Sequence, residues 1–308
     1  MDAQAAIRDP AVAGTFYPAR PAEVERALTT LFAGTTVAAP RRVVGVVCPH
    51  AGWIYSGGLA ARTLAAVQVP PRVIVLCPNH TGRGPAIAVS RAAAWRTPTG
   101  DVPIDQPMAA AILAELAAAG VSDAAGDERA HAREHAIEVQ VPLLRARQPA
   151  LQLTAIVVAH LDAESCVALG EAIARAAAAL GLAWGDDVMI VASSDMNHFA
   201  DEATTRRKDA RALAALATGD PVTLLDVVDG HDISMCGARP AAALLACAAA
   251  VGAPSPELVG YTTSGAVSGD LGAWERLALI RLAGLAQTRH GRPDRAAAVV
   301  AMLGERVS

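Results

Sequence analysis

Three stretches of sequence with the same layout decide the fold. Residues 43–50 are Val-Val-Gly-Val-Val-Cys-Pro-His, residues 73–80 are Val-Ile-Val-Leu-Cys-Pro-Asn-His, and residues 188–198 are Val-Met-Ile-Val-Ala-Ser-Ser-Asp-Met-Asn-His. Each is a short apolar run followed by turn residues and a histidine. Such a run is typical of a strand that is buried on both faces, as strands in parallel sheets are. The three stretches therefore predict the centre of a mainly parallel sheet.

Strand and helix patterns alternate along the rest of the chain. Apolar, β-branched runs predict strands at 43–48, 72–77, 86–89, 153–159, 187–193 and 276–280, and more weakly at 257–262. Helical periodicity predicts helices at 22–32, 57–67, 106–119, 137–147, 163–180, 203–217 and 239–250. We therefore expect an α/β fold, with a central, largely parallel or mixed sheet flanked by helices on both faces. No linker divides the chain, so we expect a single domain over 1–308, with a core at about 10–282 and a helical or flexible tail at 283–308.

The composition excludes several classes of protein. The chain has 308 residues, of which 53% are hydrophobic and 18% charged, and its net charge is -4. This balance argues against extended disorder, and the absence of a Lys/Arg block argues against a nucleic-acid-binding module. No apolar run is long enough to span a membrane, and the first residues lack the layout of a secretory signal. Five scattered cysteines make no disulfide framework, so we expect a reduced, cytoplasmic protein.

The histidines that follow the three apolar runs are the first candidates for a functional site. The carboxyl ends of parallel strands meet at one edge of a sheet, and ligands bind in the crevice outside that edge. We therefore expect His50, His80 and His198 to converge. Imidazole binds Zn, Fe and Cu and also transfers protons near neutral pH, so both kinds of site stay open. Asp195 adds a carboxylate beside His198, or alternatively caps the following helix.

Cys236 is the cysteine with a functional context. It precedes a glycine and a predicted helix start, where the helix dipole lowers the pKa of a thiol and favours the thiolate. A thiolate at this position would serve as a nucleophile or as a soft metal ligand. The other four are expected to be buried packing residues, at strand ends or on helix faces: Cys48, Cys77, Cys166 and Cys247.

A short motif offers an alternative metal site. His131, Glu134 and His135 fit the H-x-x-E-H pattern of inverted zincins, in which both histidines lie on one face of a helix. This motif keeps a zinc peptidase as a remote alternative. The competing interpretation is a loop that leads into a helix, with acidic residues such as Glu138 near the positive end of the helix.

Several blocks of sequence form a recognisable set. Residues 48–57, Cys-Pro-His-Ala-Gly-Trp-Ile-Tyr-Ser-Gly, closely resemble the signature P-H-A-G-[YW]-x-Y-x-G of the Memo family, called AmmeMemoRadiSam system protein B in bacteria and archaea. Further blocks keep the family's order and spacing from about residue 10 to 282: residues 13–18, 78–80, 95–98, 134–138, 193–198 and 236–240.

The resemblance implies a fold similar to that of class III extradiol dioxygenases. It also implies a metal site at the positions matching His50, His80 and Cys236, where the cysteine stands in place of the dioxygenases' glutamate. Positions matching Asp195 and His198 line the same pocket. We expect His198 to act as the general acid and base, oriented by Asp195, whose charge would favour the imidazolium.

Three further residues are expected near the site on the same grounds. Tyr55 and His135 are predicted to line the substrate pocket, and Glu138 to support the site from behind the ligands. The implied cofactor is one transition-metal ion. Fe(II) is favoured, and Cu(I) and Zn(II) also suit two imidazoles and a thiolate.

The expected function is that of a non-haem metal-binding protein, a dioxygenase-like oxidoreductase that acts on an unknown small molecule or modified substrate. The alternative is a non-catalytic accessory protein that binds a metal or ligand. The family name reflects a gene neighbourhood with a radical-SAM protein and a second small component, and this implies both as partners. Nothing in the sequence indicates a nucleic-acid or membrane partner.

Overall fold

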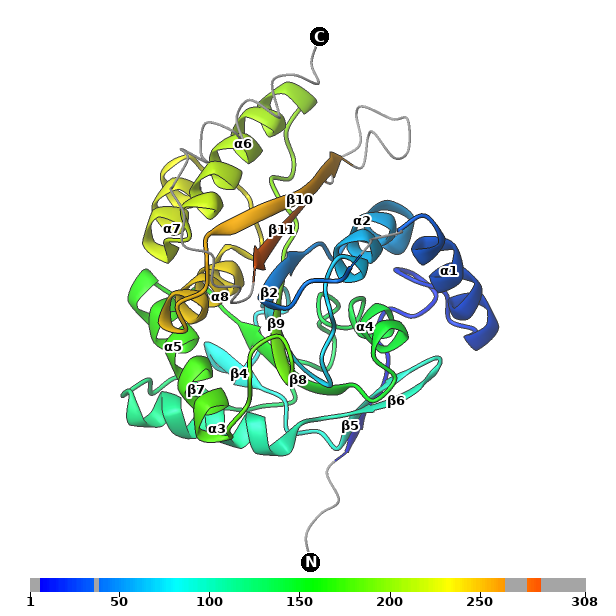
Figure 1. The fold of residues 1–308 in the computed structure, drawn as a ribbon, viewed down its shortest axis with the longest axis horizontal. Helices are drawn as coiled ribbons and strands as arrows, with labels where there is room; N and C mark the ends of the chain where they lie inside the picture. The colour runs from blue at the N-terminus through cyan, green and yellow to red at the C-terminus, as the bar shows by residue number, and fades with distance from the viewer. Residues whose placement is uncertain (1–5, 36–38, 264–275, 284–308) are drawn as a thin grey trace, which may run out of the picture.

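The structure is a computed structural model that describes residues 6–35, 39–263 and 276–283 of the chain. Its main feature is an eight-stranded mixed sheet in the order β10-β11-β2-β9-β3-β8-β4-β7 (Figure 1). The predicted tail lies outside the described residues apart from its first residue. All seven predicted strands are confirmed and belong to this sheet, which comprises β2 (Val43–Cys48), β3 (Arg72–Pro78), β4 (Ile87–Val89), β7 (Ala124–Gly126), β8 (Gln152–Val158), β9 (Val188–Ser193), β10 (Pro256–Thr263) and β11 (Arg276–Ala283).

The four central strands, β2, β9, β3 and β8, are parallel, as predicted. Their register aligns their carboxyl ends, because Cys48 of β2 pairs with Ser193 of β9 and Pro78 of β3 pairs with Val158 of β8. The outer strands make the sheet mixed, since β11 and β4 run antiparallel to their central neighbours. The alignment brings the residues that follow β2, β3 and β9 to one edge of the sheet.

Helices cover both faces of the sheet, and the strand side chains alternate between the two layers. Ile74 and Leu76 pack into the core with α3, α5, α6, α7 and α8, whereas Val73 and Val75 pack into the core with α1, α2 and α4. Figure 1 shows these two groups of helices on opposite sides of the sheet. The helices are α1 (Pro21–Ala33), α2 (Trp53–Ala65), α3 (Gln106–Ala118), α4 (Val141–Arg147), α5 (Ala163–Ala179), α6 (Glu202–Thr218), α7 (Pro221–Gly230) and α8 (Ala238–Ala250).

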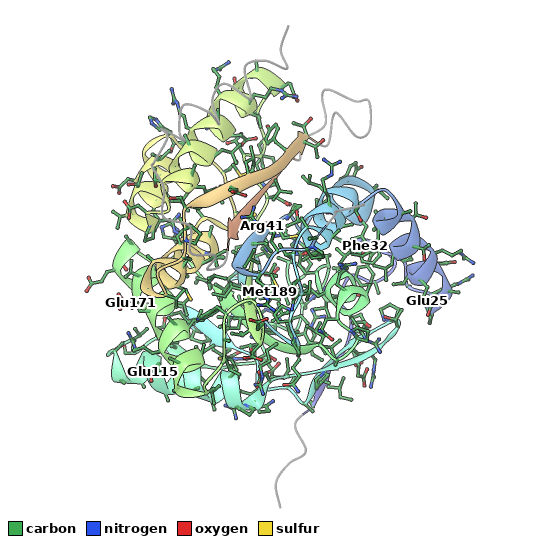
Figure 2. The ribbon with its side chains drawn as sticks, viewed as in Figure 1. Glu25, Phe32, Arg41, Glu115, Glu171 and Met189 are labelled. Carbon is green, nitrogen blue, oxygen red and sulfur yellow. The ribbon has the colours of Figure 1, made fainter. Side chains whose placement is uncertain are left out.

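Helices α5 and α8 pack closely against each other. A Cβ added to Gly170 of α5 would lie 2.3 Å from the backbone oxygen of Ala243 in α8, so only small residues allow these helices to approach. Cys166 and Cys247 are buried in the same core, as predicted. Figure 2 shows Met189 inside the molecule, whereas Glu25 and Glu171 point outward.

The structure differs from the prediction in several elements. A small second sheet of β1 (Ile7–Arg8), β5 (Ala94–Thr97) and β6 (Gly100–Pro103) was not predicted, and neither were β7 and α7. Helix α2 begins at Trp53 rather than at residue 57, with Gly52 as its N-cap. Of the helix predicted at 137–147, only α4 forms, because residues 128–140 are mostly turns. No helix of the described ranges is long and apolar enough to cross a membrane.

Candidate metal centre

Two imidazoles and a thiol meet at the carboxyl edge of the sheet. Candidate ligand atoms of His50, His80 and Cys236 all lie within 4.8 Å of one another. The separation between His50 Nε2 and Cys236 Sγ is 3.4 Å. His50 follows β2, His80 follows β3, and Cys236 comes just before α8, so the sheet register and one helix start bring together residues that are 186 positions apart. His80 is exposed, which leaves the group open to solvent on one side.

The hydrogen bonds of His50 fix its tautomer. Ser193 Oγ lies 2.9 Å from His50 Nδ1 and donates its proton to the backbone oxygen of Ala136 at 2.7 Å. The serine therefore accepts from His50 Nδ1–H, which leaves the Nε2 lone pair facing Cys236. Burial, with a smaller effect of His80, lowers the pKa of His50 to about 3. His50 is consequently a neutral imidazole that presents a ligand atom.

Glu134 gives His80 the same kind of support. Its carboxylate accepts from the backbone N–H of His80 at 2.8 Å and lies 2.9 Å from His80 Nδ1. Burial alone would raise the pKa of Glu134, but the hydrogen bonds that it accepts from His80 and Ala136 lower it to about 2. As an ionised acceptor, Glu134 holds the proton of His80 on Nδ1 and leaves Nε2 free. This carboxylate–histidine arrangement is common behind metal ligands.

We expect Glu134→Gln to lower the affinity for Zn(II) about 10- to 100-fold, the usual cost of losing the partner of a metal-ligating histidine. The amide of glutamine has one acceptor in place of two, so it cannot bond both His80 groups in the same way. Competition with a chromophoric chelator measures the affinity. Glu171→Gln on the exposed face of α5 is the control. Equal affinities of the two variants would contradict the role of Glu134.

Cys236 lies where the sequence placed it, but the predicted effect on its thiol is wrong. Helix α8 begins two residues later. A Cβ on Gly237 would lie 2.3 Å from the backbone oxygen of Ser193, so the loop that carries Cys236 packs directly against the end of β9. Burial, with the charge of Asp195, raises the pKa of Cys236 rather than lowering it. Desolvation therefore outweighs the helix dipole. A cation bound by the sulfur would reverse this effect, because a coordinating thiol loses its proton.

Asp195 belongs to the site but contacts a different partner from the predicted one. Its Oδ1 accepts from the backbone N–H of His50 at 2.8 Å, and its own N–H donates to Cys236 Sγ at 3.3 Å. Burial raises the pKa of Asp195 to about 6. The alternative role as a helix cap is also excluded, because Asp201 caps α6. Asp195 thus holds the ligand loops of His50 and Cys236 together.

His198 lies near this group and is fixed through its backbone. Its N–H donates to Ser234 Oγ at 2.6 Å, and the serine hydroxyl lies 3.0 Å from the His198 oxygen. Burial lowers the pKa of His198, although the charge of Asp195 acts in the opposite direction. The charge of Asp195 thus favours the imidazolium, as expected, but desolvation is the larger effect and the net shift favours the neutral ring. No hydrogen bond joins the two side chains in the part of the chain that the structure describes.

His135 lies beside the ligands. Its ring stacks on His80 with a centroid distance of 4.6 Å and meets His50 edge-on at 5.5 Å. Phe16 from the N-terminal segment covers it at 4.8 Å. His80, Glu134 and His135 also form a second group with ligand atoms within 4.8 Å of one another. Tyr55 lies in the first turn of α2, partly buried against the core of that face.

Glu138 is a buried anchor for the N-terminal segment. It forms an ion pair with Arg8 and accepts from the backbone N–H groups of Ala11 and Val12 and from the hydroxyl of Tyr17. These contacts occupy both oxygens of the Glu138 carboxylate. They also hold the N-terminal segment in place, and Phe16 of this segment packs against the ring of His135. Its support of the site therefore passes through the N-terminal segment.

The zinc-peptidase alternative loses its geometric basis. Neither histidine lies on a helix, since His131 is in a turn and His135 in an irregular segment, where Glu134 accepts from the backbone N–H groups of His135 and Ala136. His131 is fully buried with its ring 5.7 Å from that of Trp95. It belongs to neither of the candidate ligand groups among the described residues.

Sequence reasoning missed a buried network behind His198. Asp209 of α6 accepts from the backbone N–H of Asn197 at 2.9 Å and from the hydroxyl of Tyr261 in β10 at 2.7 Å. The Asn197 side chain in turn accepts from the backbone N–H of Ser234 at 3.1 Å. Helical periodicity could only have marked Asp209 as a polar residue on a buried face. The network joins the His198 loop to the loop that precedes Cys236.

We expect Asp209→Asn to change how stability depends on pH. Burial raises the pKa of Asp209 to about 7, against smaller opposing effects of Tyr261, Asn197 and Arg206. A raised acid pKa favours the folded state at low pH, and this contribution is lost as pH rises towards 7. Between pH 5 and 8, the wild type should lose on the order of 2–3 kcal/mol relative to Asp209→Asn. Urea unfolding of both proteins at pH 5 and pH 8 measures this change. The prediction is contradicted if the free energies of unfolding of the wild type and Asp209→Asn differ by the same amount at both pH values.

A cavity of about 420 Å³ opens beside the candidate ligands. Cys236 and Asn79, which precedes His80, belong to its wall. His160 and Arg239 add polar groups, although Arg239 is already paired with Asp229 at 2.8 Å. The cavity has the size of a small-molecule site and reaches one of the candidate metal ligands, Cys236.

Together, the fold and this site define an α/β protein with a candidate His–His–Cys centre at the carboxyl edge of its sheet. The comparisons with known proteins assign the family. A family model described as Memo-like protein matches residues 8–273, and the chain belongs to this family. It is 37% identical over 275 residues to a MEMO1 family protein of Methanopyrus kandleri, covering 85% of this chain and 94% of the relative. Relatives from Methanothermobacter thermautotrophicus and Aquifex aeolicus are each 34% identical, covering 86% of this chain and 96% and 94% of their own lengths.

Proposed function

We propose that this protein binds one transition-metal ion through His50, His80 and Cys236 and uses it in dioxygenase-like redox chemistry on a small organic substrate. The observation that carries the proposal is the meeting of three ligand atoms within 4.8 Å. Ser193 and Glu134 support it, because they hold the proton of each imidazole on Nδ1 and leave Nε2 free.

The donor set fits a soft or borderline metal. Two neutral imidazoles and a thiolate suit Fe(II), Cu(I) and Zn(II), and we favour Fe(II). When bound, such an ion would supply redox chemistry and Lewis acidity, with coordination positions that the three protein ligands leave open. The exposed side of His80 and the cavity beside Cys236 support access of a substrate to this place.

The chain's own residues would move protons and position the substrate. His198, whose pKa burial lowers, is neutral at pH 7 and suited to accept a proton from a substrate hydroxyl. Asp195 keeps the His50 and Cys236 loops together through its hydrogen bonds. His135, stacked on His80, would contact a substrate that approaches from the side of His80.

Oxygen consumption tests the proposal. The protein is loaded with Fe(II) without oxygen and then exposed to O₂ with a panel of catechols. We expect consumption that depends on His198, with a loss of about 100-fold or more in His198→Ala, within the range of general acid–base catalysis. His231→Ala, an exposed histidine at the end of α7, is the control. Consumption that is equal in the His198 and His231 variants would contradict the catalytic role of His198.

A second candidate function is metal or ligand binding without turnover. A thiolate ligand is itself open to oxidation, which favours a site that binds rather than repeatedly oxidises. In this role the protein would act as an accessory to a radical-SAM protein and a second AmmeMemoRadiSam component. One metal ion per chain without oxygen consumption would support this candidate over the enzyme.

A further inference from the structure

Phe199 is an aromatic residue in an unusual position. Its side chain follows His198 directly and is 77% exposed, the highest value among the large hydrophobic residues that the structure describes. The chain has only three phenylalanines, and the other two are partly buried. Phe199 belongs to neither hydrophobic core of the described ranges, and its ring lies 5.6 Å from the His198 imidazole. Its position therefore has no explanation in core packing.

The backbone of Phe199 is strained. Its φ of 60° is in the left-handed region, which bulky side chains rarely adopt. Asp232 is the other non-glycine residue with a positive φ in the described part of the chain, and it lies on the loop that leads to Cys236. Both strained positions thus lie on the two loops that carry site residues. Strain of this kind persists where the surroundings impose it, and it gathers at functional sites.

The residue that precedes Phe199 is held firmly on both sides of its backbone. The Ser234 hydroxyl contacts the backbone of His198 at both ends. It accepts from the His198 N–H and lies 3.0 Å from the His198 backbone oxygen. The Asn197 side-chain amide also donates to the His198 oxygen, at 3.2 Å. Buried Asp209 accepts from the Asn197 backbone. This clamp fixes the residue before Phe199 from two directions while the ring of Phe199 stays in solvent.

We infer that Phe199 is a specificity-determining residue that stacks on a flat aromatic ring of the substrate. An exposed aromatic ring gains most from a second flat ring, through offset or edge-to-face contact. Because His198 is adjacent, the matching ligand is a hydroxylated aromatic compound whose hydroxyl reaches the imidazole while its ring meets Phe199. This inference rests on the proposed function, since it names the substrate class of that same site.

Binding of a planar and a non-planar diol tests the inference. The probes are catechol and cis-1,2-cyclohexanediol, which carry the same two hydroxyl groups, and Zn(II)-loaded protein avoids oxidation of the catechol. Ligand NMR titration compares the wild type with Phe199→Leu, Phe199→Tyr and Phe199→Gly. Val222→Ala, an exposed hydrophobic residue on α7, is the matched control. Zinc content is measured on every sample.

We expect catechol to bind about five- to tenfold more weakly to the leucine and glycine variants, the value of one aromatic contact, and normally to the tyrosine and Val222 variants. The cyclohexanediol should bind all of them alike. Phe199→Gly should melt no lower than the wild type, because glycine tolerates a positive φ.

One zinc per chain with unchanged catechol affinity in Phe199→Leu would overturn the inference and leave the proposed function intact. A glycine variant that melts well below the wild type would also overturn it, by showing that the ring stabilises the fold. Wild-type protein that takes up neither Zn(II) nor Fe(II) would overturn both.

Discussion

Replacing His80 by alanine or Cys236 by serine is expected to abolish stoichiometric metal uptake. Each variant removes one of three candidate ligand atoms that lie within 4.8 Å of one another. The affinity for Zn(II) should fall by more than about 100-fold, beyond the cost of losing an outer partner such as Glu134. Metal content after equilibration with one equivalent of Zn(II), measured by elemental analysis, gives the result.

The control for this experiment is another histidine. His231 is exposed at the end of α7, outside both candidate ligand groups, so His231→Ala should keep one metal per chain. Circular dichroism confirms that each variant is folded. If His50→Ala, His80→Ala and Cys236→Ser all keep the metal content of the wild type, the assigned ligands are wrong.

Replacing Glu138 by alanine is expected to lower the free energy of unfolding by about 3–5 kcal/mol, the usual cost of breaking a buried ion pair on one side. The variant leaves the buried guanidinium of Arg8 without its carboxylate. It also removes the acceptor of the Ala11 and Val12 N–H groups and of the Tyr17 hydroxyl. Urea unfolding at pH 7 measures the change.

Two further variants separate the buried pair from ordinary surface charge. Glu115→Ala breaks an exposed pair with Arg175, so it should cost less than about 1 kcal/mol. The double variant Arg8→Met with Glu138→Leu should recover much of the loss, because no charge is then left buried and unpaired. A cost below 1 kcal/mol for Glu138→Ala would mean that this anchor does not hold the N-terminal segment.

The sheet and the ligand positions could be predicted from the sequence because both depend on one local pattern. A continuous apolar run predicts a buried strand, and the residue that follows it must lie at the edge of the sheet. This is why His50 and His80 could be placed together without knowing what lies between them. The thiol of Cys236 needed the resemblance to the Memo family as well, since a lone cysteine before a helix has no pattern of its own.

The supports behind the ligands could not be predicted, since they depend on contacts between distant residues. Glu134 meets His80 from 54 positions away, and Asp195 meets His50 from 145 positions away. Hydrophobic periodicity carries no information about such bonds. The helix predicted at 137–140 is replaced by turns, in which the N–H groups of Gln140 and Val141 donate to the oxygens of Ile137 and Glu138.

The net pKa shifts of Cys236 and His198 could not be predicted from their sequence neighbours, for a common reason. Sequence neighbours gave the helix start beside Cys236 and the carboxylate beside His198, and both favour the charged form of their neighbour. The degree of burial is a property of the whole fold, and it raises the pKa of Cys236 and lowers that of His198. Desolvation therefore decides the charge of both groups.

Anomalous scattering from crystals grown with Zn(II) or Fe(II) tests the central claim most directly. We predict a single strong peak about 2.0–2.1 Å from the Nε2 atoms of His50 and His80 and about 2.3 Å from Cys236 Sγ for zinc. A peak between His80, Glu134 and His135 instead, or no peak at the carboxyl edge of the sheet, would contradict the assigned site.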